Sequence, residues 1–506
     1  MLRKVPLVVI LGSTGTGKTK LSIELAQRFG GEIISADSMQ VYRGLDIATA
    51  KATKEEQAAA PHHLLDIAVP GQPFTVVNFR DAALPVIDDL MSRNKIPIVV
   101  GGTNYYIESL LWKILVTSKP EYENVRWDHE WPESVAKKQR TADKTSASKD
   151  GDSDSSADYS NSDNEVKQER KNDAATAAAK SGEEQVTAEE KHVELSDLLK
   201  MNAVEMAKYE SRELHRHLAV VDAVTANRLH PNNKRKIIRA LEVFAQAGKT
   251  LSAIFDEQRN EEGGSNLGGP LRYPHVIMFW LRCDQEVLNA RLDKRVDGMV
   301  EMGLLPEIRA FYDDFIKLYA CTDYTKGILQ TIGFKEFIPY LEKYSKDEDD
   351  RLLQYFSKDP SEKSSDPPES LSLLISCLDE LKLVTRRYSK RQIKWVKNRL
   401  LGNAKRIVPP IYDLDTSDVS KWRENVFARA EKVLDAYLEE KETDIKPMEK
   451  IRTGREDMTG EKSHYCATCD KILIGDYQYN LHMKSNRHKK KLASLRKKEK
   501  KAQNKE

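Results

Sequence analysis

The first hundred residues alternate between short apolar runs and amphipathic segments. An apolar run at residues 5–11 leads through a glycine-rich turn into residues 18–29, where apolar side chains recur at the spacing of one helix face. Further apolar runs at residues 32–35 and 96–100 end in small or polar residues and bracket helical segments. Apolar strands that alternate with helices predict an α/β fold, in which a parallel sheet is covered on both faces.

A polar segment interrupts this pattern. Residues 141–190 hold 13 acidic and 6 basic side chains, a net charge of −7, and almost no large aliphatic residues. Such a segment cannot bury enough apolar surface to offset its conformational entropy, so we predict a disordered insertion. It lies within a helical subdomain predicted for residues 118–215, because residues 193–201 and 211–221 have helical periodicity.

The second half of the chain returns to regular patterns. Helical periodicity resumes at residues 234–245, an apolar run at residues 276–281 predicts another strand, and long helices follow. Residues 344–370 are polar and of low complexity, so we predict a loop there. Residues 371–400 predict a helix or a helix pair that becomes strongly basic.

Charge is unevenly distributed along the chain. The 506 residues carry 81 Lys and Arg against 79 Asp and Glu, a formal charge of +2, and their number suffices for roughly two to four structural units. Without the acidic insertion the charge becomes +9, and residues 481–506 carry 11 basic and 2 acidic side chains. Segregated charge of this kind is typical of a solvated tail or of a surface that binds nucleic acid.

Cysteine content and hydropathy bear on the compartment and on membrane association. Five irregularly placed cysteines indicate a reducing compartment rather than a disulfide framework. No apolar run approaches the roughly 18 residues that a membrane span requires, and no signal-peptide pattern is present. We expect a monomer without membrane association in the cytoplasm, and a mitochondrial or nuclear share stays open.

A phosphate-binding motif joins the first predicted strand to the first predicted helix. The pattern G-x-x-x-x-G-K-[ST] is matched by Gly12, Ser13, Thr14, Gly15, Thr16, Gly17, Lys18 and Thr19. The glycines let backbone N–H groups converge on phosphate oxygens, Lys18 adds a positive charge, and the Thr19 hydroxyl can bind Mg²⁺. We therefore predict a P-loop NTPase-like parallel sheet core.

The motif leaves the reaction open. A P-loop NTPase also needs an apolar strand that ends in Asp to hold its metal. The predicted strand at residues 96–100 ends instead in Gly101, Gly102 and Thr103, and the competing segment 64–66 is short. This favours a transferase over a hydrolase, with a P-loop small-molecule kinase as the alternative.

Asp37 follows the second predicted strand, at the sheet edge where ligands of open α/β sheets bind. An Asp beside a Ser at the end of a strand is often a turn or cap residue. Because a phosphate loop precedes it by one helix, a role as general base or metal ligand competes with that interpretation.

Two cysteines and two histidines near the C-terminus have the spacing of a zinc finger. The pattern Cys466-x2-Cys469-x12-His482-x5-His488 predicts a Zn²⁺ site with four protein ligands. Fewer than about 30 residues cannot fold stably without such a staple, so the metal should be structural. Four side chains are expected to form a miniature core around it: Tyr465, Leu473, Tyr479 and Leu481.

The predicted basic helix is a candidate surface for nucleic acid. Residues 381–400 contain eight basic side chains and no acidic one, with Tyr388 and Trp395 between them. Basic side chains can bind phosphates, and aromatic rings can stack on bases or ribose. The alternative is a solvated basic helix that packs Tyr388 and Trp395 into the core.

Several blocks together resemble one enzyme family. They are the phosphate loop, residues 37–42 (DSMQVY), 49–51 (TAK), 61–66 (PHHLLD), 101–106 (GGTNYY) and 230–233 (HPNN). In content and order they closely resemble the tRNA dimethylallyltransferases, over about residues 5–435 apart from the insertion, and the zinc finger resembles the eukaryotic branch. The resemblance implies transfer of a dimethylallyl group from its pyrophosphate to the exocyclic N6 amine of the adenine 3′ of the anticodon.

The resemblance also implies roles for residues near the phosphate loop. Asp37 would accept the proton of the adenine amine, and Thr103 would bind the bridging oxygen of the pyrophosphate. Arg295 foremost, and Arg291, would bind its phosphates, as planar guanidinium groups do well. Mg²⁺ at Thr19 would stabilise the charge on the departing pyrophosphate.

Two partners follow from the same resemblance: dimethylallyl pyrophosphate and the tRNA anticodon stem-loop. The adenine must flip out of the loop to reach a site at the sheet edge. The residues implied to contact tRNA are Asp37, Ser38, Met39, Gln40, Arg235, Lys236, Arg239, Arg387, Tyr388, Arg391, Gln392 and Trp395. The zinc finger should strengthen tRNA binding through electrostatic attraction. A non-catalytic RNA-binding zinc-finger protein is the alternative from another class.

These patterns divide the chain into six parts. They are the first part of the core (residues 1–117), the helical insertion (118–215), the completed core with basic helices (216–440), a linker (441–460), the zinc finger (461–492) and a basic tail (493–506).

Overall fold

The computed structural model describes most of the chain. The described ranges are residues 5–114, 193–265, 267–317, 323–324, 326–357, 367–403, 406–451 and 462–503. The predicted disordered insertion at residues 141–190 lies outside them, so that prediction stays untested.

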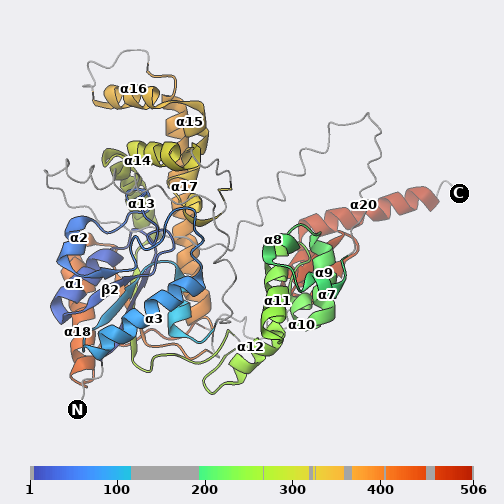
Figure 1. Cartoon of the computed structure of the whole chain (residues 1–506), viewed down its shortest axis with the longest axis horizontal. Coiled ribbons are helices and arrows are strands. Elements are labelled where there is room, and N and C mark those ends of the chain that lie inside the picture. The colour runs from blue at the N-terminus through green and yellow to red at the C-terminus, as the bar shows by residue number, and fades with distance from the viewer. Residues whose placement is uncertain are drawn as a thin grey trace.

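A six-stranded parallel sheet forms the core (Figure 1). Its strands are β1 (Leu7–Gly12), β2 (Glu32–Ser35), β3 (His62–His63), β4 (Pro97–Val100), β5 (Val276–Arg282) and β6 (Ile411–Asp415). They follow the order β3-β2-β4-β1-β5-β6, and all four predicted strands are confirmed. The sequence did not predict β3, which has two residues, or β6, in which polar and apolar residues mix.

Alternate residues of β1 face opposite layers of helices. Leu7, Val9 and Leu11 pack with α3 (Val76–Ser92) and α4 (Asn104–Leu111). Val8 and Ile10 belong to the other cluster, which includes side chains of α1 (Lys18–Phe29) and α18 (Ala428–Leu438). Because β1 is buried on both faces, its run is apolar throughout, as a central parallel strand requires. A short helix, α2 (Lys54–Ala59), precedes β3.

A third apolar cluster lies among helices that connect β5 to β6. These helices are α13 (Gln285–Glu301), α14 (Leu304–Phe311), α15 (Ile338–Lys343), α16 (Lys346–Ser357) and α17 (Leu371–Val396). The loop predicted for residues 344–370 is therefore wrong in its first part. Leu352 of α16 is fully buried, and Asp349 pairs with the buried Arg309, so tertiary contacts hold this polar helix in place.

The helical insertion is longer than predicted. Its described helices are α7 (Leu195–Leu198), α8 (Ala203–Met206), α9 (Ser211–Val221), α10 (Ala223–Arg228), α11 (Lys234–Ala247) and α12 (Leu251–Asn260). One apolar cluster unites Leu198, Leu214 and Leu241, and Leu251 packs against it. The predicted boundary at residue 215 falls inside α9, and the subdomain continues to about residue 260. Figure 1 shows these helices gathered beside the core.

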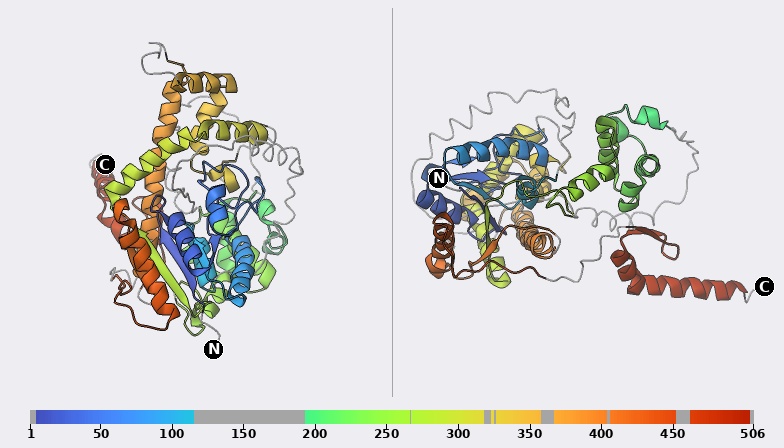
Figure 2. Two further views of the ribbon diagram at one scale, coloured as in Figure 1. Left: turned by 90° about the vertical axis from the view of Figure 1, so that its left-hand side faces the viewer. Right: turned by 90° about the horizontal axis from the view of Figure 1, so that it is seen from below.

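The C-terminal boundaries also need correction. The predicted linker begins docked to the core, because the Met448 and Ile451 amides donate to the carbonyls of Ile411 and Leu401. The finger consists of β7 (Ser463–Cys466), β8 (Lys471–Ile474), α19 (Asp476–Lys484) and the start of α20 (Asn486–Gln503). Helix α20 continues through most of the predicted basic tail and extends away from the core (Figure 2). Across the described ranges, no helix is long and apolar enough to cross a membrane.

Candidate active site at the carboxyl edge of the sheet

The phosphate loop forms the turn between β1 and α1. Gly15 and Gly17 have φ values of 80° and 83°, in the left-handed region that favours glycine. Gly17 caps α1 without a side-chain hydrogen bond, so the helix N-terminus has no side-chain competitor at this residue. Lys18 is buried, and its Nζ donates to the Ser13 carbonyl at 3.0 Å. This is the geometry of a phosphate cradle at a helix N-terminus, as the motif predicts.

A close backbone approach brings the end of β4 against the segment that follows β2. A Cβ at Gly101 would lie 2.2 Å from the Ala36 carbonyl oxygen, so only glycine fits there. This approach lets the Thr103 amide donate to the Ala36 carbonyl, while Thr103 Oγ1 accepts the Ser38 amide at 2.9 Å. Thr103 therefore lies beside the predicted base, although its role toward a bridging oxygen stays a prediction.

Asp37 is buried, and one of its oxygens is used to form a turn. Oδ1 accepts the amides of Met39 at 2.8 Å and Gln40 at 3.2 Å. The turn interpretation is thus correct for one carboxylate oxygen, and it orients the other relative to the backbone. A base and a turn residue are compatible in a carboxylate with two oxygens.

One cavity joins Asp37 to the phosphate loop. Its lining includes Lys18, Thr19, Asp37 and Gln40. His62 also lines it, and burial lowers the pKa of its imidazole. Its Nδ1 lies 2.8 Å from the Ala60 carbonyl, which can only accept, so Nδ1 carries the proton of the neutral ring.

The two predicted arginines of α13 differ in their contacts. Arg295 donates through Nη1 to the Thr14 hydroxyl and so lies at the phosphate loop, where the prediction put it. Arg291 donates to the backbone carbonyls of Gly15, Thr416 and Ser417. The guanidinium group of Arg291 thus connects the phosphate loop to residues 416–417, and its binding of phosphates stays a prediction.

Gln392 of α17 connects the two loops of the site. Its Oε1 accepts the Thr14 amide at 2.9 Å, and its Nε2 donates to the Gly102 carbonyl at 3.4 Å. The side chain is buried, with 4% of its surface exposed. Gln392 thus spans the phosphate loop and the loop before Thr103, and its contact with tRNA stays a prediction.

Residues 38–40, which are predicted to border the adenine, are held in place by hydrogen bonds to other parts of the protein. The Gln40 amide group donates to the carbonyls of Thr49 at 3.2 Å and Ala50 at 3.1 Å, and its Oε1 accepts the Ser35 hydroxyl at 3.0 Å. Both ends of the amide are thus engaged by the protein. Met39 is buried and accepts the Thr331 hydroxyl through its sulfur at 3.3 Å. Contact of Ser38, Met39 and Gln40 with adenine stays a prediction.

A stripe of basic side chains follows the outer face of α17 and continues into the π-helical turn Lys397–Leu401. Arg387, Lys390, Lys394 and Lys397 are exposed and recur at intervals of three or four residues, so they share one helix face. Lys390, Lys394 and Lys397 were absent from the predicted contacts. Helical spacing alone could have found them, because they continue the row that Arg387 begins.

The aromatic residues of this helix face the protein. Tyr388 is 1% exposed and belongs to the core cluster, with Arg391 above its ring at 5.4 Å. Trp395 is partly buried and meets Tyr105 edge to face at 5.8 Å. The predicted stacking of Tyr388 on bases is therefore wrong, and the core-packing alternative is correct for it.

The predicted basic residues of α11 lie at its N-terminal end. Arg235 and Lys236 are exposed, and Arg239 is partly exposed and lies 3.8 Å from Glu242. Asn233 caps the helix by accepting the Lys236 amide. Their contact with tRNA stays a prediction.

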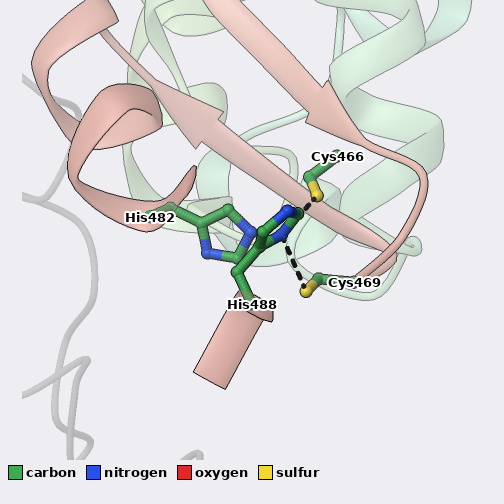
Figure 3. Close-up of side chains that lie close together, drawn as sticks. All are labelled: Cys466, Cys469, His482 and His488. Atoms are coloured by element: carbon green, nitrogen blue, oxygen red, sulfur yellow. Dashed lines mark hydrogen bonds between the residues drawn. The ribbon is translucent and has the colours of Figure 1, made fainter. Parts of the chain in front are cut away.

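The four predicted zinc ligands converge (Figure 3). One ligand atom from each of Cys466, Cys469, His482 and His488 lies within 4.8 Å of every other. Both sulfurs lie 3.5 Å from His488 Nδ1. Zn–S bonds of about 2.3 Å and Zn–N bonds of about 2.0 Å in a tetrahedron place S and N about 3.5 Å apart, so the cluster fits Zn²⁺.

The miniature core predicted for the finger is only partly formed. Tyr465 and Leu481 are 61% and 54% exposed, whereas Leu473 and Tyr479 are partly buried. In the described part of the finger, Cys466, Cys469 and His488 are the fully buried side chains. The metal ligands, rather than apolar side chains, form its centre.

The fold and the phosphate loop define a P-loop protein with a carboxylate beside its phosphate cradle. Comparison with protein-family models gives IPP transferase over residues 40–170 and 179–399, isopentenyl transferase over residues 5–66, and zinc-finger double-stranded RNA-binding over residues 463–489. The chain belongs to the IPP transferase family.

The most informative relatives are tRNA dimethylallyltransferases. Those of Mus musculus and Homo sapiens are each 38% identical over 96% of this chain and 85% of their own. That of Schizosaccharomyces pombe is 31% identical over 96% of this chain and 94% of its own. A solved structure of a eukaryotic dimethylallyltransferase acting on tRNA aligns with 99% of this chain and 100% of its own, at 25% identity and a TM-score of 0.66.

Proposed function

We propose that this protein transfers a dimethylallyl group from dimethylallyl pyrophosphate to the N6 amine of an adenine in tRNA, the one 3′ of the anticodon. The observation that carries the proposal is the shared cavity that Asp37, Lys18 and Thr19 line together. It brings a proton acceptor next to a phosphate cradle, as this reaction requires. The membership in the family supports the same conclusion.

The chemistry can be assigned to residues on the two sides of the cavity. The N6 lone pair attacks the allylic carbon, the carbon–oxygen bond breaks, and its electron pair leaves with the pyrophosphate. Asp37 accepts the proton released from N6, because the adenine amine is a weak nucleophile until it loses that proton. The amides of the loop, Lys18 and Arg295 bind the pyrophosphate charge as it develops.

Thr19 and the pyrophosphate oxygens would hold Mg²⁺. Thr19 lines the same cavity as Asp37, and a hydroxyl is among the oxygen ligands that Mg²⁺ prefers. When bound, the ion would neutralise part of the charge on the leaving group.

The tRNA would be held by basic surfaces outside the cavity. The stripe of α17 supplies four exposed basic residues, and the N-terminal end of α11 supplies Arg235 and Lys236. The finger, with its basic helix α20, would add phosphate contacts that carry no sequence information. Base contacts at the cavity would then select the adenine after it has flipped out of the stack.

The test is a transfer assay with labelled dimethylallyl pyrophosphate and an anticodon stem-loop that carries consecutive adenines. We expect label on N6 of the adenine 3′ of the anticodon and release of pyrophosphate. Absence of label together with phosphate transfer from ATP to a small molecule would favour a kinase. Stem-loop binding without either reaction would favour a non-catalytic RNA-binding protein.

A further inference from the structure

A carboxylate outside the cavity holds the segment behind the adenine-binding side of the site. Glu307 lies in the first turn of α14, and its two oxygens accept two consecutive backbone amides, Ile47 at 2.8 Å and Ala48 at 2.9 Å. We propose that Glu307 is a positioning residue for the transfer reaction, acting through residues 45–51 on Gln40 and Asp37. The inference rests on the proposed function.

The segment that Glu307 holds has an unfavourable backbone. Leu45 and Ala50 adopt φ values of 52° and 46°, in a region that side chains other than glycine rarely occupy. Such a conformation persists only when contacts from several sides determine it. Lys51 supplies a second set of contacts, since its Nζ donates to the Tyr42 and Gly44 carbonyls and pairs with Asp46. Glu307 supplies hydrogen bonds from the helical layer, where Leu45 and Ala48 also pack in the apolar cluster.

Hydrogen bonds lead from this segment to the base. The Thr49 and Ala50 carbonyls accept hydrogen bonds from the Gln40 side chain, and the backbone N–H of Gln40 donates to Asp37 Oδ1. Each link in this chain is a contact of 3.2 Å or less. A shift of the Ala48 backbone therefore moves the carbonyls that hold Gln40, and with them the turn that orients Asp37.

The contact between Glu307 and the Ile47 and Ala48 amides should depend on pH near neutrality. The pKa of Glu307 is raised to about 7: burial is the main cause, the two amides and Lys51 lower the pKa, and Asp46 adds to the rise. Protonation turns one acceptor oxygen into a hydroxyl that faces an N–H donor, which weakens one of the two hydrogen bonds. Below about pH 7 the segment should be held less firmly.

The first test compares Glu307→Gln and Glu307→Asp with the wild type and with Glu301→Gln, a matched change at an exposed position of α13. Misplacement of a reacting group is costly, so Glu307→Gln should lower kcat/KM for the stem-loop by about tenfold. Affinity for pyrophosphate should stay within about twofold of the wild type, because the phosphate loop is untouched. Wild-type kcat/KM divided by that of Glu307→Gln should rise with pH through about 7, whereas Glu307→Asp should retain the inflection and Glu301→Gln should match the wild type.

A second measurement does not depend on catalysis. Hydrogen exchange of the segment 45–51 in the full chain should be faster in Glu307→Gln than in the wild type, and that of β1 should be unchanged. Equal exchange rates in segment 45–51, or an unchanged kcat/KM and pH profile in an active enzyme, would overturn the inference. A wild type that transfers no dimethylallyl group would instead refute the proposed function, and the exchange result would still decide whether Glu307 holds the segment.

Discussion

The sheet edge and the zinc finger hold their functional side chains in opposite ways. At the sheet edge, Asp37, Lys18 and Thr103 are all at least 95% buried between layers of apolar side chains. In the finger, Tyr465 and Leu481 were expected in the interior but are more than half exposed, and the cluster of metal ligands forms the centre instead. A site that a large core supports is preorganised without metal, whereas a small module depends on the ligand bonds themselves.

The largest expected effect tests whether the sheet edge separates chemistry from binding. Asp37→Ala removes the proposed proton acceptor and should lower the transfer rate by about a thousandfold. Stem-loop affinity, measured by filter binding, should stay within a few-fold, because the proposed phosphate contacts lie on other elements. Asp37→Asn serves as the matched control, since it can keep the turn to Met39 and Gln40 without acting as a base. Activity retained in either variant would refute the assignment.

Removal of Zn²⁺ should unfold the finger and leave the core folded. Chelation of Zn²⁺, or Cys466→Ala, leaves too small an apolar core in the finger, so its amides should lose protection from hydrogen exchange. The sheet amides of β1 and β5 should keep theirs, and transfer at low salt should continue. If the finger stays protected without metal, apolar packing contributes more than its exposed side chains suggest.

Gln392 tests how far preorganisation of the sheet edge depends on one side chain. Gln392→Ala removes two hydrogen bonds, each worth about 1 kcal/mol, that connect the phosphate loop to the Gly102 carbonyl. Pyrophosphate affinity, measured by calorimetry, should fall by about tenfold. Stem-loop affinity should stay unchanged, because the side chain is buried. The opposite result, weaker RNA binding with normal pyrophosphate affinity, would support the predicted tRNA contact.

The smallest effect concerns the basic stripe of α17. Lys394→Ala should reduce the slope of log affinity against log salt by about 0.7 to 0.9, the value for one lost phosphate contact. Lys382→Ala is the matched control on the same helix, because Lys382 pairs with Asp297 at 2.6 Å. An equal slope in both variants would mean that the stripe does not contact phosphates.

The parts of the fold that could be predicted are those with strong local signals. The helix at residues 18–29 and the helix at residues 211–221 have the predicted bounds, because amphipathic periodicity and capping residues are local properties. Strand β6 and helix α16 escaped prediction, since their residues are largely polar and depend on neighbours. Pairing with β5 stabilises the first, and the contact between Arg309 and Asp349 holds the second.

Within the site, the spacing of residues in the sequence identified the candidate functional residues, and contacts in the folded structure determined their roles. The phosphate loop, Asp37 and the four zinc ligands were recognisable in the sequence, because phosphate and zinc each demand particular residues at short, fixed intervals. Nothing local distinguishes Arg291 from Arg295, or Gln392 from an RNA contact. Those roles depend on segments hundreds of residues apart that meet in the fold, where each side chain finds its hydrogen-bond partners.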